Sequence, residues 1–266
     1  MNKLLHYSLQ CTWAGWISVL HTTPCLPSGE TYARHPERVL NFDETELGGH
    51  ADCRRVAARG CRICPAVTNK SSEPNFTCCA TISASGLMLP DLLIMKGKRT
   101  PSNLLENARK GTKILKRPDG YFMTAEVFVE TLGALAATMG DLGIPVSPSE
   151  RCVLLIDGCK AHLHPECVLE GCRLGWDVVV LPAGLTHLLQ PCNQLFGPLK
   201  QAYYKLCNTA RLVNGGRLSV EGKLGLWNSA CKEKVSPEMV KRQWEKTGLW
   251  PPKLDVALQA NRNFAG

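Results

Sequence analysis

The segment CVLLIDGCKAH, residues 152–162, opens with five consecutive apolar residues and then changes at once to Asp157-Gly158. An uninterrupted apolar run of this length is typical of a strand that is buried on both faces, as strands in parallel sheets are. Residues 178–181, VVVL, form a second such run, which Pro182 ends. The two runs predict buried strands of one sheet, the first of them central and parallel, with Asp157 at its end.

Weaker sequence patterns before and after these two runs predict the other strands of the sheet and its helices. Residues 39–42, VLNF, predict a short strand that ends at Asp43, and residues 76–83 with 87–95 predict an antiparallel hairpin. The resulting order β, β, β, α, β, α, β, α predicts an α/β fold, a mixed β-sheet flanked by helices. The expected helices cover residues 124–142, 165–171 and 194–212.

Composition limits the class of protein. The chain has 266 residues, a net charge of +8, 44% hydrophobic residues and 20% charged residues, which excludes a disordered chain. No apolar window is long enough to span a bilayer, so we expect no membrane segment. The fourteen cysteines are scattered and several lie in apolar segments, which favours free thiols and a reducing compartment. The basic charge favours a polyanionic partner.

Two carboxylates stand out against this background. Asp43 and Asp157 each follow a predicted strand, and ligands of open α/β sheets bind at the carboxyl ends of strands. Two converging carboxylates repel one another unless a cation lies between them, and Mg²⁺ is the cation that such hard oxygen ligands prefer. The alternative is that Asp157-Gly158 is only a turn after a strand.

Two further clusters admit two interpretations each. Residues 96–117 hold eight Lys or Arg against the single acid Glu106, and they predict either a phosphate-contacting loop or a solvated surface. Upstream, the spacing Cys61-x-x-Cys64 is a weak signal for zinc because no second pair has the matching spacing. The upstream cluster consists of the basic residues Arg54, Arg55, Arg59 and Arg62, and of Cys53, Cys61, Cys64, Cys78 and Cys79.

Several segments together resemble a known family. They are HPERVLNFDET (35–45), SASGLMLPDLLIMKGKR (83–99), CVLLIDGCKAH (152–162), VVVLPAGLTHLLQPCNQLFGPLKQAYYK (178–205) and WEKTGLWPP (244–252). In this order they resemble the DDE superfamily endonuclease domain of pogo, Tigger and jerky-type transposases and transposase-derived proteins. The resemblance implies an RNase H-like fold, Mg²⁺ or Mn²⁺ as cofactor, DNA as partner and the nucleus as location.

The resemblance also implies three acidic metal ligands, of which this sequence keeps two. The first matches Asp43 in NFDET and the second matches Asp157 in LIDGCKAH. The third is expected as the Asp of a QPxD motif, where this chain has Asn193. An Asn carbonyl offers one oxygen and no charge, so we expect the second metal to bind weakly. Neighbours that would line the site are His162, Thr186, His187 and Gln190.

These observations predict a transposase-derived DNA-binding domain whose cleavage chemistry is impaired. The alternatives are an active metal-dependent endonuclease or transposase, and a non-catalytic Cys-rich interaction module or relic. Predicted DNA contacts are Lys96, Lys98, Arg99, Lys113, Lys116, Arg117, Lys200 and Lys205. The oligomeric state stays open, with a homodimer as one option.

Three segments are expected along the chain. Residues 1–34 form a weakly patterned N-terminal tail, 35–215 the RNase H-like core, and 216–266 a C-terminal helical extension. The first segment is too short for the helix-turn-helix module that proteins of this group usually carry. We therefore expect a catalytic-core fragment, a truncated product or a domesticated remnant.

Overall fold

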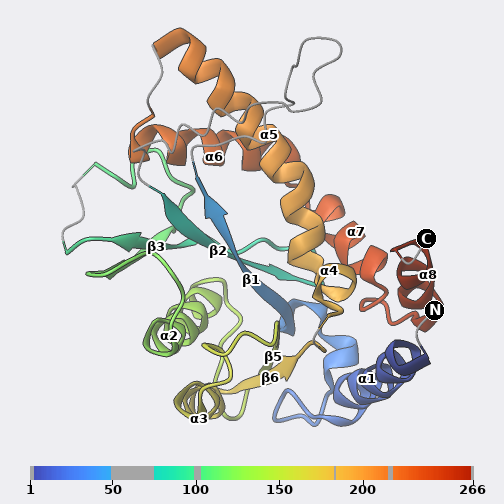
Figure 1. Cartoon of the computed structure of the whole chain (residues 1–266). Helices are drawn as coiled ribbons and strands as arrows, with labels where there is room; N and C mark the ends of the chain where they lie inside the picture. The colour runs from blue at the N-terminus through green and yellow to red at the C-terminus, as the bar shows by residue number, and fades with distance from the viewer. Residues whose placement is uncertain (1–2, 49–74, 99–102, 183, 215–217, 265–266) are drawn as a thin grey trace, which may run out of the picture.

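Six strands form one mixed β-sheet at the centre of the computed structural model, which describes residues 3–48, 75–98, 103–182, 184–214 and 218–264 (Figure 1). The strand order is β4-β3-β2-β1-β5-β6. β1 pairs antiparallel with β2, and β2 with β3, whereas the β1–β5, β5–β6 and β3–β4 pairs are parallel. The strands are β1 (Val39–Leu47), β2 (Phe76–Ser83), β3 (Leu92–Lys96), β4 (Lys113–Arg117), β5 (Cys152–Ile156) and β6 (Trp176–Val180).

The first apolar run became a buried strand, but the second did not: β6 lies at the edge of the sheet, its residues 177–179 are only half-buried, and Val180 is 40% exposed. β5 has the predicted bounds, and all five of its residues are fully buried. β2 also has the predicted bounds, and its hairpin partner β3 is antiparallel to it as expected, although the regular strand begins only at Leu92. Pro90 precedes it, and a proline has no N–H to donate to a strand ladder. The α/β architecture predicted from the sequence is therefore confirmed.

Two other predictions about strands were also wrong. The first strand does not end at Asp43 but continues to Leu47, because the residues after Asp43 pair in register with β2 as far as Phe76. The region 96–117 is not all loop, because Lys113–Arg117 forms β4 at the edge of the sheet, parallel to β3. All five residues of β4 are half-buried, and lysines are common on edge strands because they discourage pairing with other chains.

Two helices cover one face of the sheet, α2 (Ala125–Asp141) and α3 (Pro165–Leu174) (Figure 1). The predicted 4, 3, 4, 3 spacing places Phe128 and Leu132 of α2 against Phe42 and Leu154 of the sheet. α3 ends at Gly175, whose φ of 99° lies in the left-handed region. A Cβ on this glycine would lie 2.1 Å from the carbonyl oxygen of Ser147, so only glycine fits this turn into β6.

The remaining helices cover the other face and its margins (Figure 1). α5, which was expected at 194–212, is longer than predicted and crosses this face with Leu195, Phe196, Leu199 and Tyr203 buried along its length. The helices are α1 (Lys3–Thr22), α4 (Thr186–Leu189), α5 (Pro191–Asn214), α6 (Val220–Lys234), α7 (Pro237–Thr247) and α8 (Leu254–Phe264), and two short 3₁₀ helices, Tyr32–Arg34 and Pro36–Arg38, precede β1.

The first and last segments of the chain lie side by side. α1 buries Trp13, Trp16 and Leu20, and the indole N–H of Trp16 donates to the carbonyl of Leu249 over 3.0 Å. α1 also contacts α8 (Figure 1). None of the helices in the described part of the chain combines the length and the apolarity that crossing a bilayer requires.

Candidate active site

Asp43 and Asp157 lie on the two central parallel strands. β1 and β5 pair in register up to Asn41 opposite Leu155, and continuing that register by two residues places Asp43 beside Asp157. β5 ends at Ile156, so Asp157 leaves the sheet at the level where Asp43 is still held inside β1. The two carboxylates of the sequence prediction are therefore brought together at one end of the sheet.

Asp43 is held in a strongly negative environment. Its side chain is buried, and burial together with the charges of Glu44 and Asp157 raises the pKa of this carboxyl to about 8. Hydrogen bonds from the backbone and from the side chain of Gln190 act in the opposite direction but do not cancel the rise. The charge of Asp43 also reaches Lys200 on α5, although burial lowers the pKa of this lysine overall. A cation between the carboxylates would relieve this repulsion.

His162 links Asp157 to a third carboxylate, Glu44. Its Nδ1 lies 2.8 Å from Oδ1 of Asp157 and its Nε2 lies 2.8 Å from Oε1 of Glu44. The ring is 1% exposed and packs against Phe42 and Phe128, with centroids 5.9 and 4.4 Å apart. Burial opposes the charged imidazole, but the two hydrogen bonds and carboxylate charges raise the pKa of His162 to about 10. The same contact with His162 lowers the pKa of Asp157.

Asn193 lies in the first turn of α5, on the other side of Asp43. Its Nδ2 donates to Oε1 of Gln190 over 2.7 Å, and Gln190 in turn hydrogen-bonds to Asp43. Gln190 is 1% exposed, and its amide also reaches the carbonyl of Phe42 at 3.4 Å. Asp43 thus feels the charge of Asp157 on one side and is joined through one side chain to Asn193 on the other.

A buried asparagine fixes the start of α5 against the sheet. Oδ1 of Asn41 accepts from the backbone N–H of Cys192 over 2.8 Å, and its Nδ2 donates to the carbonyl of Leu155 over 3.0 Å. Asn41 is fully buried, so both bonds are shielded from water. Because α5 is attached to β1 and β5 at this point, the position of Asn193 relative to Asp43 is set by the core.

Two other acidic residues, Glu44 and Glu166, could replace the third carboxylate only from elsewhere in the fold, and neither faces Asn193. Neighbouring strand residues point to opposite faces, so Asp43 points to the side of α5 and Glu44 to the side of α2. Their strand partners confirm this, because Ala80 packs under α5 whereas Cys79 packs under α2. Glu166, at the start of α3, has a side chain that is 71% exposed. The site therefore holds two carboxylates where three would be expected.

Two other residues expected near the site, Thr186 and His187, lie in α4. His187 is exposed, and its backbone carbonyl accepts from the side chain of Gln194 over 2.9 Å. Thr186 is half-buried, and its carbonyl accepts the backbone N–H of Gln190. Both therefore shape the turn that presents Gln190, and neither shows a contact with Asp43 or Asp157 among the described residues.

The predicted DNA contacts separate into two groups. Lys113 donates to Thr138 on α2 over 3.2 Å, and Arg117 donates to Thr124 at the start of the same helix, so both are engaged within the fold. Lys96, Lys98 and Lys205 are exposed, and Lys116 and Lys200 are half-buried. Arg99, the Arg54, Arg55, Arg59 and Arg62 cluster, and Cys53, Cys61 and Cys64 lie outside the described residues. Cys78 and Cys79 are buried on opposite faces of β2.

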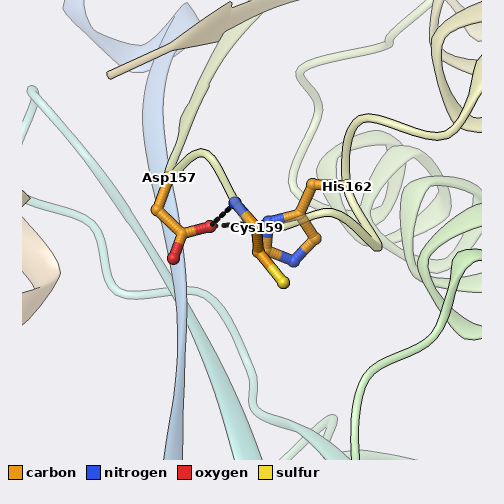
Figure 2. Close-up of side chains that lie close together, drawn as sticks. All are labelled: Asp157, Cys159 and His162. Carbon is orange, nitrogen blue, oxygen red and sulfur yellow. Dashed lines mark hydrogen bonds and ion pairs between the residues drawn. The ribbon is translucent and has the colours of Figure 1, made fainter. Parts of the chain in front are cut away.

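One contact and one residue of this region were not predicted from the sequence. The bond from Glu44 to His162 joins residues 118 positions apart, and a single sequence carries no signal for such a contact. Cys159 follows Asp157 by two residues and its backbone N–H donates to the Asp157 carboxylate over 3.0 Å (Figure 2). The spacing Asp157-x-Cys159-x-x-His162, three metal-ligating types directly after a buried strand, was a signal that could have identified this thiol.

The donor atoms at the end of β1 and β5 suit a hard divalent cation. Carboxylate oxygens of Asp43 and Asp157 and the amide oxygen of Asn193 are ligand types that Mg²⁺ and Mn²⁺ accept. Two carboxylates also fall within the one or two that Mg²⁺ usually takes from a protein. A second cation would have to rely on the uncharged Asn193.

A mixed sheet with two carboxylates at its central parallel strands defines a nuclease-type α/β domain. Comparison with known proteins identifies its family. Residues 74–241, more than half of the chain, match the DDE superfamily endonuclease family, and the chain belongs to this family. The matched range contains Asp157 and Asn193, whereas Asp43 precedes it and is placed by the strand register.

Solved structures confirm the fold. The chain is similar to the catalytic domain of Mos1 mariner transposase, with a TM-score of 0.50, 14% identity and coverage of 96% of this chain and 94% of that one. A chain of the Mos1 strand transfer complex gives the same TM-score and identity, but this protein spans only 63% of its length. No curated protein sequence matches. The RNase H-like fold implied by the sequence is thus confirmed, and the domain belongs to the DDE superfamily endonuclease family.

Proposed function

We propose that this chain is a transposase-derived DNA-binding domain of the pogo, Tigger and jerky type whose DNA cleavage is impaired. A nuclear location and DNA as partner are parts of this proposal. The observation that carries it is the side chain of Asn193, which stands in the first turn of α5 and is joined to Asp43 through Gln190. A neutral amide occupies the place from which a third carboxylate would complete the site.

The two remaining carboxylates supply a site for one divalent cation. Asp43 and Asp157 would hold Mg²⁺ or Mn²⁺, which when bound in pairs stabilises both the attacking and the leaving oxygen of a phosphodiester. His162 keeps the Asp157 carboxylate oriented by a hydrogen bond of 2.8 Å. The side chain of Gln190 accepts from Asn193 over 2.7 Å and also lowers the pKa of Asp43, so Asn193 stands next to a residue that acts on the carboxylate pair.

Charge supports DNA as the partner. The chain carries a net +8, and Lys96 and Lys98 are exposed where β3 leaves the sheet. Exposed lysines that neutralise phosphates release counterions, which gives affinity without sequence specificity. Lys200 lies close enough to Asp43 to feel its charge, so the basic side chains reach the carboxylate site itself.

The first prediction concerns the natural protein. Incubated with supercoiled plasmid DNA and Mg²⁺ or Mn²⁺, it should bind the DNA and leave it almost uncut, because the second cation lacks a charged ligand. Gel separation of supercoiled and nicked forms measures this. The paired control is Asp157→Ala, which should look the same as the natural chain. Nicking by the natural protein that disappears in Asp157→Ala would show an active endonuclease and overturn the proposal.

The second prediction concerns DNA affinity. Replacing Lys96 and Lys98 together by Ala should reduce the slope of log Kobs against log salt by about 1.8, at about 0.9 per lost phosphate contact. Fluorescence anisotropy of labelled duplex DNA at several salt concentrations measures the slope. The matched control replaces the exposed Lys241 and Lys253, which lie at the opposite end of the molecule beside α7 and α8, and should leave the slope unchanged. A natural protein whose binding does not depend on salt would contradict phosphate contact.

A further inference from the structure

Three different metal-ligating groups meet in the turn that follows β5. The ligand atoms of Asp157, Cys159 and His162 all lie within 4.8 Å of one another. Figure 2 shows the carboxylate, the thiol and the imidazole gathered around this turn, with Asp157 bonded both to the ring of His162 and to the backbone of Cys159. The ring of His162 in this group packs against Phe128 of α2.

The thiol sets this cluster apart from a magnesium site. Thiolate is a soft ligand that selects Zn²⁺ and similar ions, whereas Mg²⁺ prefers oxygen alone. Of the ten cysteines whose side chains the structure describes, only Cys159 and Cys172 are exposed, and the other eight are buried. Cys159 is thus accessible to an ion from solution, and two of the other potential ligands stand beside it.

His162 is already oriented as a metal ligand. Zinc-binding histidines usually donate their second ring N–H to a carboxylate, which fixes the ring and its tautomer. Here Nε2 lies 2.8 Å from Oε1 of Glu44, and Nδ1 lies 2.8 Å from Oδ1 of Asp157. The rings of Phe42 and Phe128 hold the imidazole in this orientation. The second coordination sphere that a zinc site needs is therefore present in the fold.

We propose that Asp157, Cys159 and His162 form a binding site for a borderline divalent cation of the Zn²⁺ class, with Oδ1, Sγ and Nδ1 as ligands and Glu44 as the carboxylate behind the histidine. Tetrahedral bonds of about 2.0–2.1 Å need the oxygen and nitrogen about 3.3 Å apart, a small opening from their present separation of 2.8 Å. Sγ needs to approach to about 3.5 Å, which rotation of an exposed side chain supplies. Three protein ligands leave the fourth position to solvent.

This site goes beyond the proposed function and does not depend on it. It shares only Asp157 with the carboxylate pair, and it takes only Oδ1 of that carboxylate. Because binding of the Zn²⁺-class ion needs neither DNA nor cleavage, it can be measured separately from both.

The test uses Co²⁺ as a spectroscopic substitute for Zn²⁺ on the full chain, kept reduced by a phosphine. Thiolate bound to Co²⁺ gives a near-ultraviolet charge-transfer band, and we expect this band to be lost or reduced by the equivalent of one thiolate in Cys159→Ala. Cys172→Ala, which removes the other thiol that is exposed in the described part of the chain, should retain the full band. The difference between these two variants isolates Cys159 from the remaining cysteines. No band in the natural protein, or an equal band in both variants, would overturn the proposal.

A second variant tests the histidine. Glu44→Gln keeps a hydrogen-bond acceptor for His162 but removes its charge, and loss of such an outer partner weakens metal affinity by about 10–100-fold. Competition of Zn²⁺ against the Co²⁺ band gives this affinity. An unchanged affinity in Glu44→Gln would place the ion elsewhere. Failure of the plasmid experiments would leave the Co²⁺ result unaffected, so the two proposals fail separately.

Discussion

Asn193→Asp should nick supercoiled plasmid DNA about 10²-fold faster than the natural chain in the presence of Mg²⁺ or Mn²⁺, since a metal ligand that stabilises transition-state charge contributes several kcal/mol and each 1.36 kcal/mol is tenfold in rate. The residue is exposed, so the fold should tolerate the change. The substitution removes the N–H that Gln190 accepts and leaves two acceptors facing one another, which frees the new carboxylate to turn toward a cation.

Two controls make the result specific to the third carboxylate. Asn193→Ala removes the same hydrogen bond without adding charge and should stay as inactive as the natural chain. Combining Asn193→Asp with Asp157→Asn should return the rate to background, because the new carboxylate acts only with the existing pair. If Asn193→Asp is as inactive as Asn193→Ala, then a missing ligand at position 193 is not what limits cleavage.

The same measurement separates the competing functions. An active endonuclease that tolerates Asn193 should cut DNA without the substitution and gain little from it. A protein-interaction module without a nucleic-acid role should neither bind duplex DNA with a salt-dependent affinity nor respond to position 193. The impaired nuclease alone combines salt-dependent binding with activity that appears on restoring one charge.

The buried part of the fold could be predicted from the sequence because burial leaves a local pattern. Five apolar residues in a row gave the bounds of β5, and helical spacing gave α2 to within one residue of each end. Gly143 and Pro145 were sufficient to end that helix, because one favours a left-handed turn and the other cannot continue a helix. Such signals depend only on neighbours along the chain.

The margins of the sheet could not be predicted in the same way. β4 reads KILKR, has no residue that is fully buried, and owes its existence to pairing with β3 rather than to its own pattern. The predicted first strand was too short because the second half of β1, DETEL, is polar. Pairing with β2 nevertheless extends β1 to Leu47. In both cases hydrogen bonds from a neighbouring strand decided the structure.

The features of the candidate site likewise fall into those that the sequence predicted and those that depend on contacts between distant residues. Asp43 and Asp157 were predicted because each follows a predicted strand, and Asn193 followed from the resemblance to a family. The register of β1 and β5 then accounts for the proximity of the first two. The link through Gln190 and the bridge from His162 to Glu44 join distant parts of the chain, so only the folded structure reveals them. Those links also show toward which face of the sheet each carboxylate points.

A buried ion pair holds the C-terminal helices to the sheet. Asp91, which directly precedes β3, has a side chain that is 2% exposed, and Nη1 of Arg109 donates to its Oδ1 over 2.7 Å. Its other oxygen accepts the indole N–H of Trp227 on α6 over 3.1 Å. Arg109 also donates to the backbone carbonyls of Met88 and Leu89. The guanidinium of Arg109 thus compensates the charge of the buried Asp91 carboxylate between β3 and α6.

Arg109→Met should lower the free energy of unfolding by about 3–5 kcal/mol, because removing one partner of a buried pair leaves the other charge uncompensated. Urea denaturation should show a lower midpoint with an unchanged slope. The matched control is Arg173→Met on α3, whose guanidinium binds Glu170 through two bonds at 2.6 and 2.7 Å but is 69% exposed, and it should leave the midpoint unchanged. Equal midpoints in the two variants would contradict a buried charge pair.

The loss of stability in Arg109→Met should also depend on pH and should increase as the pH rises from mildly acidic to neutral. Burial raises the pKa of Asp91, and Arg109 acts against that rise, so without the guanidinium the pKa rises further. A carboxyl with a higher pKa in the folded than in the unfolded state makes the folded protein bind more protons, and its stability then falls as the pH rises above the unfolded pKa. The loss relative to the natural chain should therefore be largest at neutral pH and shrink on mild acidification. A loss that is the same at both pH values would point to lost packing of the Arg109 side chain instead of an unpaired Asp91.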